Sequence, residues 1–116
     1  MTDAALRAWS VAWMIARILT GEVGVVPQAA YPVAQVAMNR LEAGMGYDGW
    51  HAIAEEPEPW ALDAAWEAWR LGGDRNGPLN ALSKQDMADL GFDVSEWCEI
   101  CSEDGRWCEY IGRWPK

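Results

Sequence analysis

The sequence predicts a mainly helical (α+β) domain that closes with a small C-terminal β-hairpin. Residues 3–20, 32–43 and 60–71 contain no glycine and carry apolar residues at helical spacing, which predicts three helices. The tail over residues 94–116 differs, because it is rich in Cys and Trp and centres on Asp104-Gly105, a pair typical of two-residue hairpin turns. A chain of 116 residues is one domain by size, so residues 1–116 are expected to share one core with this tail inside it.

The first predicted helix carries one narrow polar stripe. The stripe consists of Asp3, Arg7, Ser10 and Arg17. The remaining residues are apolar almost all round, which predicts a helix buried over most of its surface. Thr2 or Asp3 can cap its N-terminus, and Gly21 is expected to end it, so that Glu22 lies just beyond the helix.

The next two helices have simpler patterns. Pro32 suits the first turn of the second helix, whose expected buried face is Val33, Val36, Ala37 and Leu41. The third helix, over 60–71, is expected to bury Leu62, Ala65, Trp66 and Trp69. Residues 44–59 and 74–82 are expected to be loops, because glycine and proline interrupt both segments.

A fourth, shorter helix is predicted after the second loop. Ser83 to Asp86 matches a capping-box pattern, in which the serine hydroxyl accepts a hydrogen bond from the backbone three residues later. Met87 and Leu90 are expected to anchor this helix, and Gly91 is expected to end it.

The three cysteines, Cys98, Cys101 and Cys108, all lie in the tail. Counting outward from the turn pairs Cys101 with Cys108, close enough for a disulfide. A zinc site is a second interpretation, with Cys98, Cys101, Cys108 and His51 as ligands, although a second Cys-x-x-Cys pair is absent. Reduced, partly buried thiols are the third, and the sequence leaves all three open.

Composition excludes several classes of function. The chain has 18 acidic and 9 basic residues and a net charge of −9, which argues against nucleic acid and against anionic membranes as partners. No apolar run reaches the roughly 18 residues that a membrane span needs, so no membrane insertion is expected. Residues 1–20 also lack a signal-peptide pattern, which predicts cytoplasmic synthesis. The chain has one histidine and no glycine-rich phosphate loop, so no cofactor is expected.

Carboxylates are the remaining candidates for chemistry, and Glu22 is the most distinctive of them. It follows an apolar helix and lies between Gly21 and Gly24. Apolar surroundings raise the pKa of a carboxyl group, which a general acid needs in order to protonate a glycosidic oxygen near neutral pH. An ordinary loop glutamate is the alternative. The nine Trp residues likewise suit either core packing or stacking against sugar rings.

Two blocks of the sequence resemble the SleB-like cell-wall hydrolases. Residues Ala16–Gly24 are similar to that family's opening motif A-R-x-I-x-G-E-A-R-G, with Glu22 at the glutamate. Residues Pro32–Leu41 are similar to its V-A-x-V-x-x-N-R-V helix, at the right distance along the chain. Looser similarity continues over Ala64–Asp74, Gly77–Ala81 and Tyr110–Trp114.

The resemblance implies a lysozyme-like fold and cleavage of the glycan strand of peptidoglycan, by hydrolysis or by lytic transglycosylation. It implies that Glu22 acts first as acid and then as base, without a second catalytic carboxylate. Asn39 and Arg40 match the family's N-R pair, which we interpret as structural, with the asparagine bonded to backbone. Tyr31, Trp50 and Trp60 are the candidate sugar-contacting aromatic residues.

The chain departs from the family in three places. Val23-Gly24 replaces A-R-G, Arg113 replaces the closing histidine, and the acidic stretch Glu55–Trp60 occupies the place of a Q-F-S block. An enzyme of this kind is expected to be a phage endolysin or a virion-associated lysin, acting on the wall after release or as part of a particle. The alternative is a non-catalytic glycan-binding module or a phage structural protein on the same fold.

Overall fold

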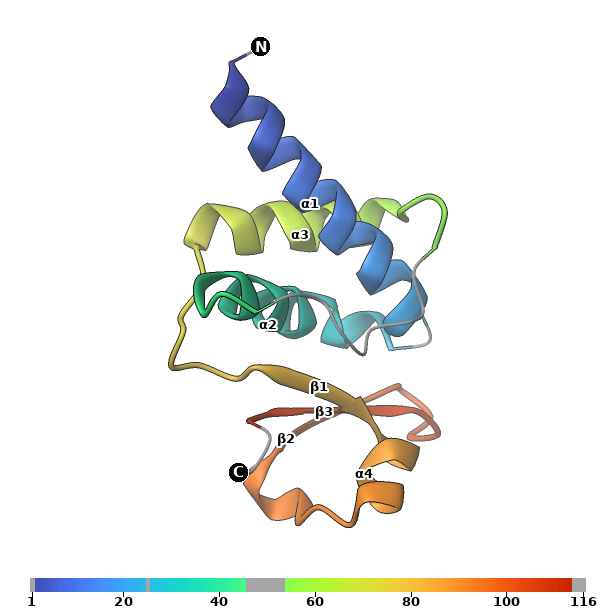
Figure 1. Ribbon diagram of the computed structural model, residues 1–116. Helices are drawn as coiled ribbons and strands as arrows, with labels where there is room; N and C mark the ends of the chain where they lie inside the picture. Colours follow the sequence, from blue (N-terminus) through green and yellow to red (C-terminus); the bar gives the residue numbers. More distant parts are fainter. Residues whose placement is uncertain (1, 25, 46–53, 114–116) are drawn as a thin grey trace.

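The computed structural model describes residues 2–24, 26–45 and 54–113 (Figure 1). The elements follow in the order α1 (Asp3–Glu22), η1 (Pro27–Ala29), α2 (Ala30–Glu42), α3 (Pro59–Leu71), β1 (Asn80–Ser83), α4 (Lys84–Leu90), η2 (Val94–Glu96), β2 (Cys98–Cys101) and β3 (Cys108–Gly112). The prediction of a mainly helical protein with a small β-hairpin is therefore confirmed. Within the described ranges, no helix combines the length and apolar character that crossing a membrane requires.

The elements form two layers (Figure 1). Helices α1, α2 and α3 pack together on one side of an antiparallel sheet of order β1-β3-β2, and α4 lies beside the sheet. The predicted pairing of Cys101 with Cys108 across the hairpin is confirmed. Strand β1 corrects the prediction of a loop over 74–82: its four residues lack a clear alternation, and pairing with the central strand β3 makes them a strand.

Helix α1 begins as predicted and ends later than predicted. The Thr2 hydroxyl accepts a hydrogen bond from the Ala5 backbone N–H at 3.1 Å, which caps the N-terminus. Gly21 does not end the helix, because its backbone avoids the left-handed conformation of a glycine cap and the Val23 N–H still bonds to the Leu19 carbonyl. Glu22 is therefore the last residue of the helix instead of the first residue beyond it.

Only the second half of α1 is buried. Its buried residues are Ala12, Ile15, Ala16, Ile18 and Leu19. The first half extends past the other helices (Figure 1), and Trp9 there is 44% exposed. The expected burial over the whole helix is thus wrong for the N-terminal turns, where Trp9 contacts Trp13 and Trp66 at 5.7 Å between ring centroids.

The core of the helical layer depends on small side chains. Ala61, Ala65 and Ala68 of α3 are fully buried, so α3 approaches α1 and α2 closely, while the predicted Leu62, Trp66 and Trp69 are only half-buried around them. On α2, Val33, Val36 and Ala37 are buried as predicted. Leu41 is exposed, because the buried face runs through Met38, Asn39 and Arg40 instead.

A second core lies on the other face of the sheet. It consists of Met87, Trp97, Cys108 and Tyr110, with Leu82, Phe92 and Cys101 packed against it. Helix α4 begins with the predicted cap, in which the Ser83 hydroxyl accepts from the Asp86 N–H at 3.2 Å, and it ends at Gly91 with a φ of 71°. Met87 anchors the helix, whereas Leu90 is exposed, contrary to the prediction.

Buried polar side chains of α2 connect the helical layer to the chain that leads into the sheet. The Asn39 side-chain amide donates to the Pro78 carbonyl at 2.9 Å, and its oxygen accepts from the Asp74 N–H at 2.7 Å. Arg40 donates to the Leu79 carbonyl at 2.9 Å. The structural interpretation of Asn39 and Arg40 is therefore confirmed, because both hold the backbone just before β1.

Candidate active site

A cavity of about 450 Å³ lies where the C-terminal end of α1 meets the sheet. Its walls come from both layers of the protein. The lining residues are Glu22, Val26, Ser83, Lys84, Gln85, Ala88, Arg106, Trp107, Cys108 and Glu109. The cavity therefore combines two carboxyl groups, two basic side chains and one indole, which is the set of groups that a site for a polar, ring-containing substrate needs.

Glu22 reaches this cavity because of its position on α1. It lies one turn after Ile18 and Leu19, which are fully buried, and it shares their side of the helix. Val23 and Val26 follow it and are also buried, so the chain is fixed on both sides of Glu22. The half-buried Glu22 side chain thus borders the space between the two layers.

Glu109 is the second carboxyl group of the cavity and belongs to the central strand β3. Successive residues of a strand point to opposite faces, so Glu109 shares the face of Ile111, which packs into the helical core. Cys108 and Tyr110 point to the other face, into the second core. Glu109 is only 8% exposed, and its neighbours across the sheet are Ser83 and Ile100.

The surroundings of Glu109 favour its protonated form. The pKa of Glu109 is raised from an ordinary value of 4.5 to about 7, mainly by burial and in smaller part by the negative charges of Glu22 and Asp86. Glu109 can therefore carry a proton near neutral pH beside the negative charge of Glu22. Two carboxyl groups with such different environments can divide proton donation from charge stabilisation.

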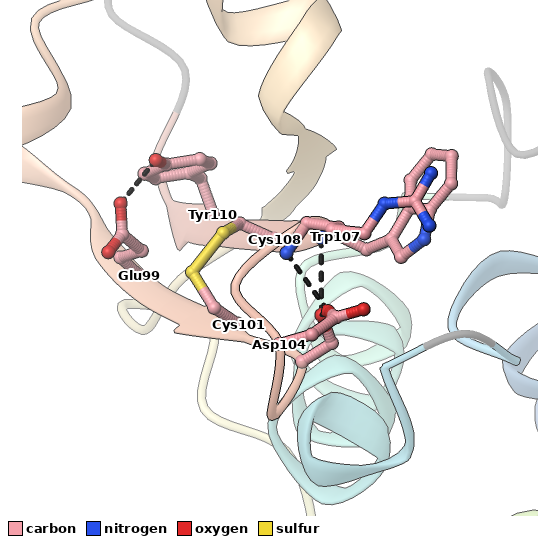
Figure 2. Close-up of a disulfide and its surroundings, with 8 residues drawn as sticks. Glu99, Cys101, Asp104, Trp107, Cys108 and Tyr110 are labelled. Atoms are coloured by element: carbon pink, nitrogen blue, oxygen red, sulfur yellow. Dashed lines mark hydrogen bonds between the residues drawn. A yellow bond between two sulfur atoms is a disulfide. The ribbon is translucent and has the colours of Figure 1, made fainter.

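The tip of the β2–β3 hairpin contributes Arg106 and Trp107 to the lining of the cavity. Asp104 accepts hydrogen bonds from the Ser102 hydroxyl at 2.6 Å and from the Arg106 N–H at 3.0 Å (Figure 2), and both lower the pKa of its carboxyl. Trp107 follows, 52% exposed, with the Arg106 guanidinium 6.0 Å from its ring centroid. The tip thus holds an indole in a defined place at the mouth of the cavity.

The aromatic residues predicted from the sequence lie elsewhere. Tyr31 is in the first turn of α2 with its hydroxyl 3.4 Å from the Gln35 side-chain oxygen, and Trp60 is in the first turn of α3, packed against the helical core. Among the described residues, the lining of the Glu22 cavity includes neither. Trp50 lies outside the described residues. The structure brings Glu22 together with Trp107 instead.

The cysteines form a disulfide and one free thiol. Cys101 and Cys108 are joined (Figure 2), while Cys98 is free and exposed. Cys98 is three residues before Cys101 on β2, so the two side chains point to opposite faces of the sheet. The zinc interpretation is therefore wrong for these three residues, since two of the thiols are consumed and the third points away. His51, its fourth ligand, lies outside the described residues.

One acidic residue lies next to the disulfide. The Glu99 carboxylate and the two sulfur atoms lie within 4.8 Å of one another. A disulfide sulfur is a poor metal ligand, because metal binding by cysteine needs the thiolate. The Glu99 carboxylate also accepts a hydrogen bond from the Tyr110 hydroxyl, which raises the pKa of Tyr110 (Figure 2). This group therefore supports the hairpin instead of a metal.

Sequence reasoning missed Glu109, although the signal was present. The pairing of Cys101 with Cys108 already determines which face each residue of the last strand occupies. Glu109 is the one charged residue of that strand, Cys-Glu-Tyr-Ile-Gly, and it falls on the same face as Ile111. A single acid on an inward face of a central strand is a candidate for a functional group.

Comparison of the chain with models of protein families, with curated proteins and with solved structures finds no match. The resemblance to the SleB-like hydrolases thus depends on the residues quoted above, and the geometry of the cavity is the independent evidence on function.

Proposed function

We propose that this protein cleaves the glycan strand of peptidoglycan, with Glu22 and Glu109 as its catalytic residues. One observation carries the proposal. Two carboxyl groups, one at the end of α1 and one on the central strand β3, line the same cavity, and the buried one has its pKa raised to about 7. The resemblance of the segment around Glu22 to the SleB-like cell-wall hydrolases supplies the substrate class.

The chemistry of glycoside cleavage suits this pair. The leaving oxygen must receive a proton, and the sugar develops positive charge as the bond breaks. We assign proton donation to Glu109, because burial raises its pKa, and we assign stabilisation of the positive charge to Glu22. The resemblance alone makes Glu22 first the acid and then the base, and the presence of a second carboxyl in the cavity supports giving proton donation to Glu109 instead.

The reaction needs no cofactor and can end in one of two products. Water can attack the sugar carbon and give a hydrolysed end, or a hydroxyl of the muramic sugar can attack the same carbon and give an anhydro end. In both cases the attacking O–H returns its proton to Glu109. We further propose that the chain acts on the wall as a phage endolysin after release, or as part of a virion.

Digestion of purified peptidoglycan tests the proposal, with the soluble fragments identified by mass spectrometry. Wild type is expected to release disaccharide-containing fragments with reducing or anhydro ends. Glu22→Gln keeps the shape of the side chain and removes its charge, and it is expected to lose activity by about 100-fold or more.

Glu42→Gln is the matched control. Glu42 is the last residue of α2, as Glu22 is of α1, but it is exposed and lines no wall of the cavity. It is expected to keep wild-type activity. Equal digestion by Glu22→Gln and wild type would contradict the proposal.

A non-catalytic glycan-binding or phage structural protein is the second candidate, and one observation favours it. The segment that stands in place of the family's Q-F-S block is bound to α1: the Thr20 hydroxyl accepts from the Glu58 N–H at 3.0 Å, and Arg17 donates to the Ala54 carbonyl at 2.9 Å. That segment therefore has a structural use here. Binding to peptidoglycan without release of fragments would favour this candidate.

A further inference from the structure

A second cavity lies on the other side of Trp107. It measures about 680 Å³ and is lined by Pro27, Gln28, Ser102, Glu103, Asp104 and Trp107. Among the described residues, Trp107 is shared by the linings of this cavity and of the cavity that holds Glu22 and Glu109. Trp107 therefore separates the cavity that holds Glu22 and Glu109 from the second cavity.

Hydrogen bonds and a disulfide fix the backbone of the hairpin tip at Trp107. The Trp107 backbone N–H donates to the Ser102 hydroxyl at 3.2 Å, and the Ser102 backbone N–H donates to the Trp107 carbonyl at 2.7 Å. The adjacent disulfide closes the two strands behind the tip, and Figure 2 shows the Trp107 side chain directed away from it. The fold therefore sets the place of Trp107 at the tip, and a preformed backbone reduces the conformational entropy that is lost when a ligand binds.

The exposure of Trp107 has no evident structural reason. Trp97, on the other face of the sheet, is 8% exposed and packs in the second core, whereas Trp107 is 52% exposed and belongs to neither core. An exposed indole with polar side chains beside it suits the apolar C–H face of a pyranose ring, whose hydroxyl groups then bond to those side chains. Gln28 and Ser102 supply such groups here.

We propose that Trp107 is a stacking platform that joins the two cavities into one groove, and that this groove binds consecutive sugar units of the β-1,4-linked amino-sugar chain of peptidoglycan. The substrate class rests on the proposed function. A chain instead of a single sugar is inferred because Trp107 lines both cavities.

Binding of N-acetylglucosamine oligomers of two to six units tests the proposal, measured by calorimetry on Glu22→Gln protein so that no bond is cleaved. Affinity is expected to rise with chain length until both cavities are filled. Adding Trp107→Ala is expected to weaken binding of the longest oligomer by about 10-fold or more, because the apolar face on which a sugar ring would pack is removed. Trp107→Phe is expected to retain most of the affinity.

Trp9→Ala is the matched control, because Trp9 is similarly exposed and lines neither cavity. It is expected to bind as the parent does. The proposal would be overturned if Trp107→Ala bound the longest oligomer with unchanged affinity, or if affinity did not increase for oligomers longer than two units. The binding test and the cleavage test can fail independently. If binding depends on chain length but the wild type does not cleave, only the proposed function is contradicted. If the wild type cleaves but Trp107→Ala binds equally well, only the role of Trp107 as a stacking platform is contradicted.

Discussion

The helical layer and the sheet layer of this protein are stabilised in different ways. Helices α1, α2 and α3 pack through fully buried alanines such as Ala16, Ala61 and Ala65. The second core, on the far face of the sheet, instead contains the large rings of Trp97 and Tyr110 and a disulfide. The close-packed helical layer contributes Glu22 from the end of α1, while most of the cavity wall comes from the sheet, α4 and the hairpin tip.

The two layers also differ in how far their site residues can be recognised from the sequence. The two blocks with the clearest resemblance to a known family, Ala16–Gly24 and Pro32–Leu41, lie in the helical layer and identify one carboxyl. The second carboxyl and the exposed indole belong to the sheet layer, whose motifs are weak. A site at the junction of two layers therefore depends on the contacts that hold the layers together, and those contacts can be tested one at a time.

The largest effect is expected from breaking the junction at Asn39. Asn39→Leu keeps the volume of the side chain but leaves the Asp74 N–H and the Pro78 carbonyl without their partner in a part-buried place. We expect a loss of about 4 kcal/mol in the free energy of unfolding, measured by urea denaturation, because each buried polar group left unpaired costs roughly 1–3 kcal/mol. A loss below about 1 kcal/mol would show that the layers do not depend on this contact.

The next effect concerns Glu109, and its sign depends on pH. The pKa of Glu109 is about 7 in the folded protein against an ordinary value of 4.5, so the folded state holds the proton more tightly. The stability from this group is fully present below pH 4.5 and is lost as pH rises through 7. Glu109→Gln is therefore expected to stabilise the protein by about 3 kcal/mol at pH 8.

At pH 4.5 the same substitution is expected to have little effect, because the wild-type carboxyl is then neutral as well. Thermal or urea unfolding at both pH values measures the difference. Glu42→Gln serves again as the control and is expected to show no such dependence on pH. Equal stability of wild type and Glu109→Gln at pH 8 would indicate that burial of this carboxyl carries no penalty.

A smaller effect is expected from the disulfide, which belongs to the sheet layer alone. Replacing Cys101 and Cys108 by serine opens a loop of sequence separation 7, and loop-closure entropy predicts a loss of roughly 2–3 kcal/mol. The helical signal in circular dichroism should persist at room temperature, because α1 to α3 make no use of this bond. Loss of the helical signal together with the hairpin would mean that the two layers fold only as a unit.

The sequence predicted the elements that depend on local patterns. Helical spacing located α1, α2 and α3, the capping pattern at Ser83 located α4, and Asp104-Gly105 gave the pairing of Cys101 with Cys108. Strand β1 was missed, because pairing with β3 creates it, and the end of α1 was placed two residues too early, because Gly21 can remain helical.

The candidate site was predicted only in part. Glu22 was identified from its motif and its apolar helix. Glu109 and Trp107 were not, because burial of the first and exposure of the second are decided by contacts between layers that are distant in the sequence. Tyr31 and Trp60, which the sequence offered as sugar-contacting aromatic residues, do not line the cavity, because tertiary packing directs them to other places.

The central claim is that carboxyl groups from the two layers act together on one glycosidic bond. The most direct test is the rate of peptidoglycan cleavage by wild type, Glu22→Gln, Glu109→Gln and the double variant, compared at equal folded concentration. We predict that the cleavage rate of each single variant falls by about 100-fold or more, and that the double variant is scarcely slower than the less active of the two single variants. A wild-type cleavage rate in folded Glu109→Gln would contradict the joint action of the two carboxyl groups.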